Sequence, residues 1–338
     1  MPGGLATAAT RIASAIGVAA VAAGAWGSLI ERTQWTLRRV EVPVLPAGAD
    51  PVRVLHVSDL HMAPWQRSKQ EWVAALAALH PDLVVNTGDN LGHVRGLEGI
   101  RRAFAPFAGI PGVFVNGSND YFGPVLKNPF SYFGGPSVNL GRAAELDIAA
   151  LHAFFGELGW TDIDNRATSL DLRGTHFEFF GVDDPHKGYD RLDLITAAID
   201  DLRSDDPLGD DVWPDPATVP HPRPTVTVGV THAPYQRVLN SFVTHGAQLM
   251  LAGHTHGGQV CVPGYGALVT NCDIPRTQVK GLSLWRHGLR SAYLHVSAGL
   301  GTSIYAPVRF ACPPEATLLT LTAARPARTT AGSVVGSA

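Results

Sequence analysis

The chain has 338 residues, which is enough for one large domain or two ordinary ones. Hydrophobic residues make up 45 % of it and charged residues 16 %, a composition that excludes global disorder. The net charge of −3 lacks the basic footprint of nucleic-acid-binding proteins, so we expect no nucleic-acid partner. The 3 cysteines include no C-x-x-C pair and therefore indicate neither a zinc knuckle nor a disulfide framework.

An uncharged apolar run extends from Ile12 to Ile30 and matches the roughly 20 residues that a helix needs to cross a bilayer. It is open to three interpretations, namely a membrane anchor, a cleaved export signal, and a helix packed on the domain. We favour a single-pass anchor, because only Arg11 precedes the run and Trp26 lies near its end, where interfacial aromatic residues occur. We assign residues 1–40 to this helix and its linker.

The charges around the run bear on the orientation of the anchor. Arg32, Arg38 and Arg39 follow the run and outweigh Arg11 before it. The positive-inside rule then favours a cytoplasmic position for the following domain, with export as the alternative.

Apolar runs typical of strands alternate with stretches of helical periodicity over residues 41–323, which we take as one domain. Strands are predicted at 52–58, 83–87, 113–116, 225–231 and 248–253, with later ones at 293–297 and 316–321. Helices are predicted at 68–79, 97–107, 147–158 and 235–244, and a hairpin at 167–172 and 176–181. Residues 122–141 and 204–224 read as surface loops, and 324–338 as a disordered tail. Alternation of this kind predicts an α/β fold with mostly parallel strands.

Short polar motifs follow five of these strands directly. They read Ser58-Asp59-Leu60-His61, Thr87-Gly88-Asp89-Asn90, Asn116-Gly117-Ser118-Asn119-Asp120, Thr231-His232-Ala233-Pro234 and Gly253-His254-Thr255-His256-Gly257-Gly258-Gln259. Parallel strands bring their carboxyl ends to one edge of a sheet, so we expect these side chains to share one crevice. Carboxylates and imidazoles together suit divalent Mn, Fe and Zn, and burying so many of them without cations would be costly.

The ordered series D-x-H, G-D, G-x-x-D, H and G-H-x-H resembles the calcineurin-like metallophosphoesterase superfamily. Within it, the G-H-T-H-G-G-Q motif, the short N-terminal apolar segment and Ser297-Ala298-Gly299-Leu300-Gly301-Thr302-Ser303 resemble bacterial membrane-associated enzymes grouped with UDP-2,3-diacylglucosamine hydrolases. The resemblance covers roughly residues 52–322. It implies a four-layer α/β/β/α sandwich, with the apolar helix added at the N-terminus.

The resemblance also implies a pair of divalent metal ions, whose identity (Mn, Fe or Zn) the sequence leaves open, with a bridging hydroxide as nucleophile. Asp59, His61 and His256 would bind the first ion. Asp89 would bridge both, and Asn119, His232 and His254 would complete the second. Asn119, Asp120 and His232 are the candidate catalytic residues.

The third motif departs from the family. Gly117-Ser118-Asn119-Asp120 stands where the family reads G-N-H-D, so the usual histidine, a candidate acid for the leaving group, is replaced by Asn119. An asparagine amide has an oxygen that can bind a metal, but it cannot supply a proton. Our hypothesis is that Asn119 binds the second metal with Ser118 near it. Protonation of the leaving group then falls to water or another histidine, or is unnecessary for a pyrophosphate.

The predicted function is hydrolysis of a phosphodiester, phosphomonoester or pyrophosphate, and the membrane segment makes a lipid-linked or nucleotide-sugar-lipid substrate one option. The alternative is a non-catalytic metal-binding module with an impaired third motif. A hydrolase of another fold would need an H-E-x-x-H or G-x-S-x-G motif, and the sequence has neither. The sequence carries no indication of the oligomeric state.

Overall fold

The computed structural model describes residues 3–124, 143–204, 225–302 and 306–324, with side chains from residue 11 onward. Most of the two predicted surface loops, Ser303 of the late motif and nearly all of the predicted tail lie outside these ranges. The helices are α1 (Gly3–Leu29), α2 (Arg67–Ala75), α3 (Gly96–Phe104), α4 (Ser118–Tyr121), α5 (Ile148–Leu158), α6 (Leu192–Ser204) and α7 (Gln236–Thr244).

The strands form two large sheets and a small ribbon. The first is a 6-stranded sheet of β1 (Thr36–Leu45), β14 (Glu315–Ala323), β2 (Val52–Val57), β3 (Leu83–Asn86), β4 (Gly112–Phe114) and β5 (Trp160–Asp162), in that order. The second, also 6-stranded, runs β12 (Gly281–His287), β13 (Arg290–Val296), β9 (Leu249–Ala252), β8 (Thr225–Val230), β7 (Thr175–Gly181) and β6 (Ala167–Leu172). The ribbon joins β10 (Cys261–Val262) to β11 (Gly266–Ala267).

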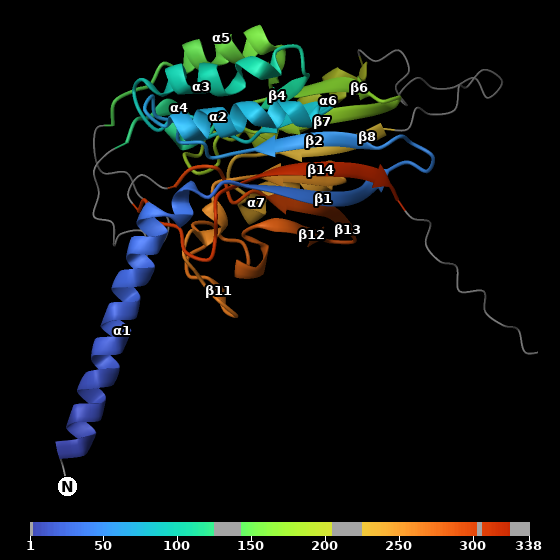
Figure 1. Cartoon of the computed structure of the whole chain (residues 1–338). Helices are drawn as coiled ribbons and strands as arrows, with labels where there is room; N and C mark the ends of the chain where they lie inside the picture. Colours follow the sequence, from blue (N-terminus) through green and yellow to red (C-terminus); the bar gives the residue numbers. More distant parts are fainter. Residues whose placement is uncertain (1–2, 125–142, 205–224, 303–305, 325–338) are drawn as a thin grey trace, which may run out of the picture.

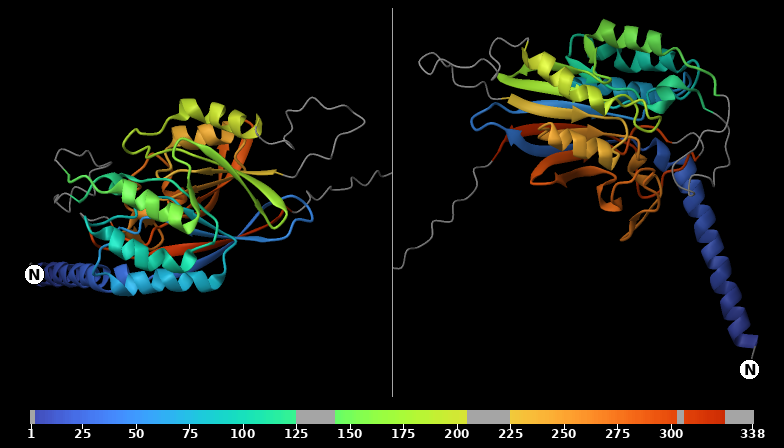
Figure 2. Two further views of the ribbon diagram at one scale, coloured as in Figure 1. Left: turned by 90° about the horizontal axis from the view of Figure 1, so that it is seen from above. Right: turned by 180° about the vertical axis from the view of Figure 1, so that it is seen from behind.

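Three apolar cores separate four layers, as the predicted α/β/β/α sandwich requires. Helices α2, α3 and α5 cover the outer face of the first sheet, where Phe104 and Phe155 are buried. Helices α6 and α7 cover the second sheet, with Phe242 against Phe180. The third core lies between the sheets, and Figure 2 shows the helices outside them. Each such side chain contributes about 1.5–3 kcal/mol when it is fully buried.

The central strands are apolar on both faces because both faces are covered. In β2, Val54 points into the core between the sheets and Leu55 into the core beneath the helices. This alternation follows from the two-residue period of a strand. Strands β2 to β5 are mutually parallel, and so are β7, β8, β9 and β13. The loops after β2, β3, β4, β8 and β9 therefore reach one edge of the sandwich.

Helix α1 projects from the body of the molecule, as Figure 1 shows. Its C-terminal end is fixed to the domain: Arg309 donates its backbone N–H to the Gly27 carbonyl at 3.1 Å, and Cys312 donates to the Glu31 carboxylate at 2.6 Å. The span Arg11–Thr33, with a mean hydropathy of 1.7, is the one segment of the described chain long and apolar enough to cross a membrane.

The boundary predicted after residue 40 falls inside β1, which begins at Thr36 and pairs in parallel with β14. The prediction interpreted Arg38 and Arg39 as charges flanking a membrane segment. They are exposed residues of an edge strand, where charged side chains are common, and Arg38 forms a 3.0 Å ion pair with Glu315.

Candidate metal centre

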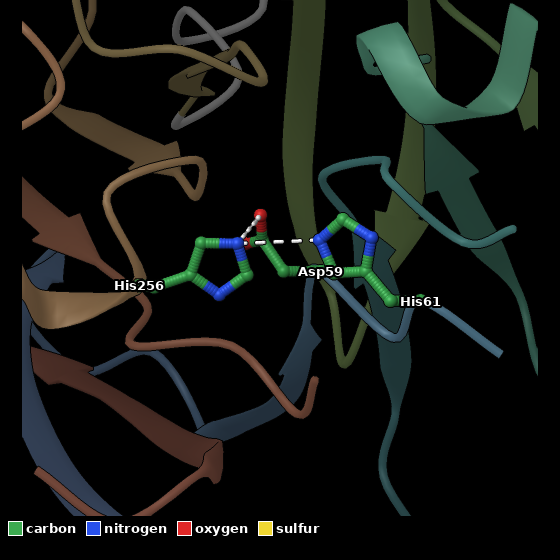
Figure 3. Close-up of side chains that lie close together, drawn as sticks. All are labelled: Asp59, His61 and His256. Atoms are coloured by element: carbon green, nitrogen blue, oxygen red, sulfur yellow. Dashed lines mark hydrogen bonds and ion pairs between the residues drawn. The ribbon is translucent and has the colours of Figure 1, made fainter. Parts of the chain in front are cut away.

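Asp59, His61 and His256 meet at the edge of the sandwich (Figure 3), although the two histidines come from opposite sheets. One ligand atom from each lies within 4.8 Å of the others. The Nε2 atoms of His61 and His256 are 3.2 Å apart, and His256 Nε2 lies 3.6 Å from Asp59 Oδ1. All three side chains are buried.

A second group, Asp59, Asp89 and His232, shares Asp59 with the first and meets the same distance limit of 4.8 Å. The carboxylate of Asp89 joins the two groups, because its Oδ2 lies 3.5 Å from Nε2 of both His61 and His232. His254 completes the arrangement, with its Nδ1 3.3 Å from His232 Nε2. The structure thus brings all of the predicted histidine and aspartate ligands together.

The loops hold several of these ligands in a backbone conformation that side chains other than glycine rarely adopt. Asp59, His61, Asp89, His254 and His256 have φ values of 51°, 40°, 55°, 67° and 50°. Such left-handed conformations cost of order 1–3 kcal/mol each and concentrate at functional sites. The strain follows from turning each chain sharply at the end of its strand, which directs the side chain into the shared site.

Two positions next to the ligands must be glycine, because neighbouring atoms leave no space for a side chain. A Cβ on Gly117 would lie 2.8 Å from His232 Cε1, and one on Gly253 would lie 2.6 Å from Asp59 Oδ2. Contacts this short are not tolerated, so the loops can approach each other only where no side chain intervenes.

Burial sets the protonation of most of the site. It lowers the pKa of His61 to about 4 and holds those of His254 and His256 well below the usual range, so these imidazoles are neutral near pH 7. It also raises the pKa of the Asp59 carboxyl to about 6.

Asp89 and His232 behave differently. Burial opposes the ionisation of both groups, but the surrounding charges outweigh it. They lower the pKa of Asp89 well below its usual value and raise the pKa of His232 well above its usual value. Neutral imidazoles beside an ionised carboxylate are in the form that binds a metal.

The sequence profile described as calcineurin-like phosphoesterase matches residues 52–258, more than half of the chain. The chain belongs to the calcineurin-like phosphoesterase family. A Bacillus subtilis (strain 168) protein with the name "uncharacterized metallophosphoesterase YkuE" is 23 % identical over 310 residues, covering 87 % of this chain and 86 % of its own length. Family membership supports a metal-dependent phosphoesterase.

Solved structures with a related arrangement are more distant. TT1561 of Thermus thermophilus is 14 % identical, with a TM-score of 0.41 over 74 % of this chain and 91 % of its own. The phosphopantetheinyl hydrolase PptH of Mycobacterium tuberculosis is 13 % identical, with a TM-score of 0.36 over 80 % of this chain and 98 % of its own.

The donor set fits the divalent metals of a calcineurin-like phosphoesterase. Two imidazole nitrogens lie 3.2 Å apart, and each is near a carboxylate. Burying these polar groups without a cation would be costly, and a bound cation would stabilise them. His61 Nδ1 is buried and has no hydrogen-bond partner among the described residues. Mixed nitrogen and oxygen donors suit Mn, Fe or Zn.

Backbone carbonyls and one arginine orient the histidine ligands from behind. His232 Nδ1 lies 2.7 Å from the Thr87 carbonyl, and His254 Nε2 lies 3.1 Å from that of Asn271. Arg309 contacts the His256 carbonyl at 3.1 Å and His256 Nδ1 at 3.4 Å. Such contacts fix ring orientation and tautomer, and they support metal affinity.

The sequence leaves Arg309 open as a residue for the substrate phosphate or as a surface arginine, and Gln259 as a residue for the phosphate or as a loop amide. The structure rules out the surface position of Arg309 and places Gln259 as a loop amide. Arg309 is fully buried and donates to the carbonyls of Ala298, Gly299 and Gly301. Gln259 is buried too and donates to the Ala306 carbonyl at 2.9 Å. No local sequence signal distinguishes a buried arginine from an exposed one, so only the fold reveals this role.

The altered third motif lies inside the site. Asn119 donates its backbone N–H and its Nδ2 to the two oxygens of Asp89, at 2.8 and 2.7 Å. Ser118 donates to Asp184 at 2.8 Å. Asn119 is therefore placed beside the carboxylate predicted to bridge the metals, whereas Ser118 is bonded to Asp184.

Other polar residues near the ligand motifs differ in whether they border the site. The His186 ring lies 4.7 Å from that of His254, and Asp184 accepts from the His186 backbone at 2.9 Å, so both border the site. Asn90 supports Asp120 through a 3.3 Å bond from its amide. His93 instead accepts from the Arg95 backbone and makes an edge-to-face contact with Trp65, with the ring centroids 4.9 Å apart.

Proposed function

We propose that the chain hydrolyses a phosphodiester, phosphomonoester or pyrophosphate with two divalent ions, taken from Mn, Fe and Zn. The observation that carries the proposal is the overlap of two donor groups that share Asp59 and are joined by Asp89. One group alone would serve a single ion. Two such groups, formed from four loops at one edge of the sandwich, match the requirement of a two-metal phosphoryl-transfer site.

Each ligand has a place in this proposal. Asp59, His61 and His256 hold the first ion, Asp89 lies between the two, and Asn119, His232 and His254 hold the second. Bound divalent cations supply an activated water and neutralise charge that develops on the phosphoryl oxygens. The residues themselves keep the neutral imidazoles of His61, His254 and His256 and an ionised Asp89 in fixed positions, which is the preorganisation that catalysis requires.

The leaving group is the point at which this chain differs from its family. The Asn119 amide cannot transfer a proton, so its contribution is to hold Asp89 and to offer its oxygen to the second ion. We propose that the proton comes from water or from His186, whose Nδ1 is 3.0 Å from the Tyr235 hydroxyl, or that the substrate is a pyrophosphate whose leaving group needs none.

The test is an assay with a nitrophenyl phosphodiester and Mn²⁺, alongside metal analysis of the full chain. We expect turnover that chelation abolishes and Mn²⁺ restores, and no turnover for Asp89→Ala. A protein that binds metal stoichiometrically but turns over no diester, monoester or pyrophosphate would instead be the non-catalytic module.

The role of Asn119 is tested separately. Asn119→Ala should lose about half of the bound metal, because one of the two ions loses a ligand. Two fully occupied sites with unchanged turnover would disprove the role. Asn240→Ala is the matched control, since Asn240 bonds to Trp285 at 2.9 Å outside the site.

We further propose that α1 anchors the enzyme in a membrane as a single pass, with the catalytic domain on the cytoplasmic side. The apolar span Arg11–Thr33 supports the anchor, and Arg32 at its domain end is the charge that favours this orientation. A lipid-linked substrate, as in the diacylglucosamine hydrolase branch, is the specific form of the proposal. Labelling of a cysteine introduced at exposed Leu289 in intact cells and in inverted vesicles tests the side, and labelling in intact cells alone would reverse it.

A further inference from the structure

A pocket of about 370 Å³ lies where α1 joins the domain, and none of the candidate metal ligands lines it. Its basic residues are Arg32, Arg67 and Lys69, and its aromatic walls are Trp35 and Trp65. No acidic residue of the described chain lines it. The pocket therefore combines three cations with two indole rings, and nothing in the proposed hydrolytic chemistry uses it.

The basic residues of this pocket form no close ion pair in the described part of the chain, and Arg67 interacts with Glu98 only at longer range. None of Arg32, Arg67 and Lys69 forms a salt bridge there with a carboxylate within 4.0 Å. Lys69 is only 4 % exposed, and its Nζ donates to the Leu60 carbonyl at 2.7 Å, which leaves two of its three N–H donors for a ligand. Burial lowers the pKa of Lys69 to about 7, and the charges of Arg309 and Arg32 contribute less to this shift. An anion in the pocket would raise the pKa of Lys69 again.

Further donors surround the same space. Helix α2 begins at Arg67, and its N-cap residue Gln66 forms no side-chain cap. The Arg67 N–H donates to the Trp65 carbonyl at 2.9 Å, and residues Gln66 to Lys69 at this helix N-terminus line the pocket, where the helix dipole favours an anion. Trp35 lines the pocket, and its indole Nε1 is buried without a hydrogen-bond partner among the described residues. An unpartnered buried donor is costly, and an anionic oxygen would satisfy it.

The position of the pocket indicates where such an anion comes from. The apolar span ends at Thr33, and Arg32 and Thr33 both line the pocket. Trp65 of the pocket exposes 66 % of its surface, and Trp26 and Ile30 near the end of the apolar span expose 43 % and 42 %. When α1 crosses a bilayer, this combination of basic and indole side chains lies at the level of the lipid head groups, where Trp and Arg are favoured.

We propose that this pocket binds the phosphate of an anionic phospholipid head group at the membrane surface. The inference rests on the membrane attachment proposed above and is independent of turnover. Arg32, Arg67 and Lys69 would bind the phosphate oxygens, and the tryptophans would contact the glycerol and the beginning of the acyl chains. The chain would then be held by two signals, a weakly apolar helix and a head-group site.

Such binding would also hold the domain in a fixed position relative to the bilayer. The pocket wall includes Leu300 and Gly301, which donate their N–H groups to the carbonyls of Ser58 and Asp59 at 3.0 and 2.6 Å. Lys69 contacts Leu60 in the same loop. The lipid site thus lies directly behind the loop that carries the metal ligands Asp59 and His61.

The experiment uses the full chain with Mn²⁺ in neutral maltoside micelles and counts bound ligand by native mass spectrometry. Dioctanoyl phosphatidylglycerol is titrated in one arm, dioctanoyl phosphatidylcholine in a second and inorganic phosphate in a third. The test variant is Arg32→Gln/Arg67→Gln, in which two exposed arginines of the pocket lose their charge. The control is Arg39→Gln/Arg102→Gln, which removes the same charge from exposed positions outside the pocket.

We expect one phosphatidylglycerol per chain. Its affinity should be about ten-fold weaker in the pocket variant, because the variant loses charge-assisted hydrogen bonds to the lipid phosphate, and unchanged in the control. Equal affinity in all three proteins overturns the proposal, as does equal binding of phosphatidylcholine. Inorganic phosphate that occupies the pocket as strongly as the lipid would overturn the lipid assignment. Turnover of the soluble diester, followed in the same samples, reports separately on the proposed hydrolase.

Discussion

Asp120 shows how a single buried carboxylate can organise a metal centre without touching its ligand atoms. It is fully buried and accepts backbone N–H bonds from Asp89 at 2.8 Å, Asn90 at 2.7 Å, Leu91 at 3.2 Å and Gly117 at 3.0 Å. These bonds join the second and third ligand loops. Its predicted catalytic role stays a prediction, and its contacts are those of a positioning residue.

Replacing Asp120 by Asn separates the two roles. The amide would present its NH₂ to backbone donors, leaving at least one of them unpaired, so we expect about 10–100-fold weaker metal binding. If Asp120 only positions the loops, saturating Mn²⁺ restores kcat. If it acts on the substrate, kcat stays low at every Mn²⁺ concentration, and the positioning role is excluded. Asp147→Asn, at the N-cap of α5, makes the same change outside the site and should alter neither quantity.

At the scale of elements, the short turn between β4 and α4 decides whether the two sheets can share one site. Gly117 is in this turn and faces both Asp89 from the first sheet and His232 from the second. A methyl group here has no space, because a Cβ would lie 2.8 Å from both Asp89 N and His232 Cε1.

Gly117→Ala should therefore separate the ligand loops while the three cores stay intact. Overpacking of this kind costs typically 1–3 kcal/mol, so we expect metal affinity to fall about ten-fold or more, with little change in far-ultraviolet circular dichroism. Gly156→Ala is the control: this position in α5 has no atom within 4 Å of the added Cβ, and it should gain about 0.5–1 kcal/mol of stability. Unchanged metal binding in Gly117→Ala would show that the loops do not depend on this close approach.

For the whole molecule, a buried histidine pair joins the two sheets. His56 on β2 and His295 on β13 face each other with their Nδ1 atoms 2.9 Å apart, and His56 Nε2 lies 3.0 Å from the Thr87 hydroxyl. Burial lowers the pKa of His295 to about 4, and burial followed by the charge of His295 lowers that of His56 well below the usual range. Both rings are neutral in the folded protein.

This pair makes the free energy of unfolding depend on pH. Unfolded histidines take up protons below about pH 6.5, whereas His295 in the folded protein resists protonation down to about pH 4. The free energy of unfolding is therefore unaffected by this group above about pH 6.5, and it decreases as the pH falls from there toward about pH 4. His295→Gln removes one titrating group and should flatten this decrease by about 1.4 kcal/mol per pH unit between pH 6 and 5. Urea unfolding at several pH values measures it. The exposed His287→Gln serves as control, and equal slopes for wild type and His295→Gln would contradict the prediction.

Local patterns predicted much of the fold because they report local physics. Apolar runs identified the strands at β2, β3, β8 and β9, and helical periodicity identified α2, α3, α5 and α7. Elements without a strong local pattern, such as α6, the short β5 and the edge strand β12, were not predicted, and β1 was divided by a linker boundary. The arginines of β1 resemble membrane-flanking charges until β14 is placed beside them.

The sequence by itself determined the family and predicted the types and order of the candidate ligands, since metal chemistry requires carboxylates and imidazoles beside tight turns whatever surrounds them. Only the tertiary structure decided that Asp89 lies between His61 and His232, that Arg309 is buried behind His256, and that basic and indole side chains form a pocket at the end of α1. These relations join residues far apart in the chain, and they arise from the packing of two sheets, which no local pattern encodes.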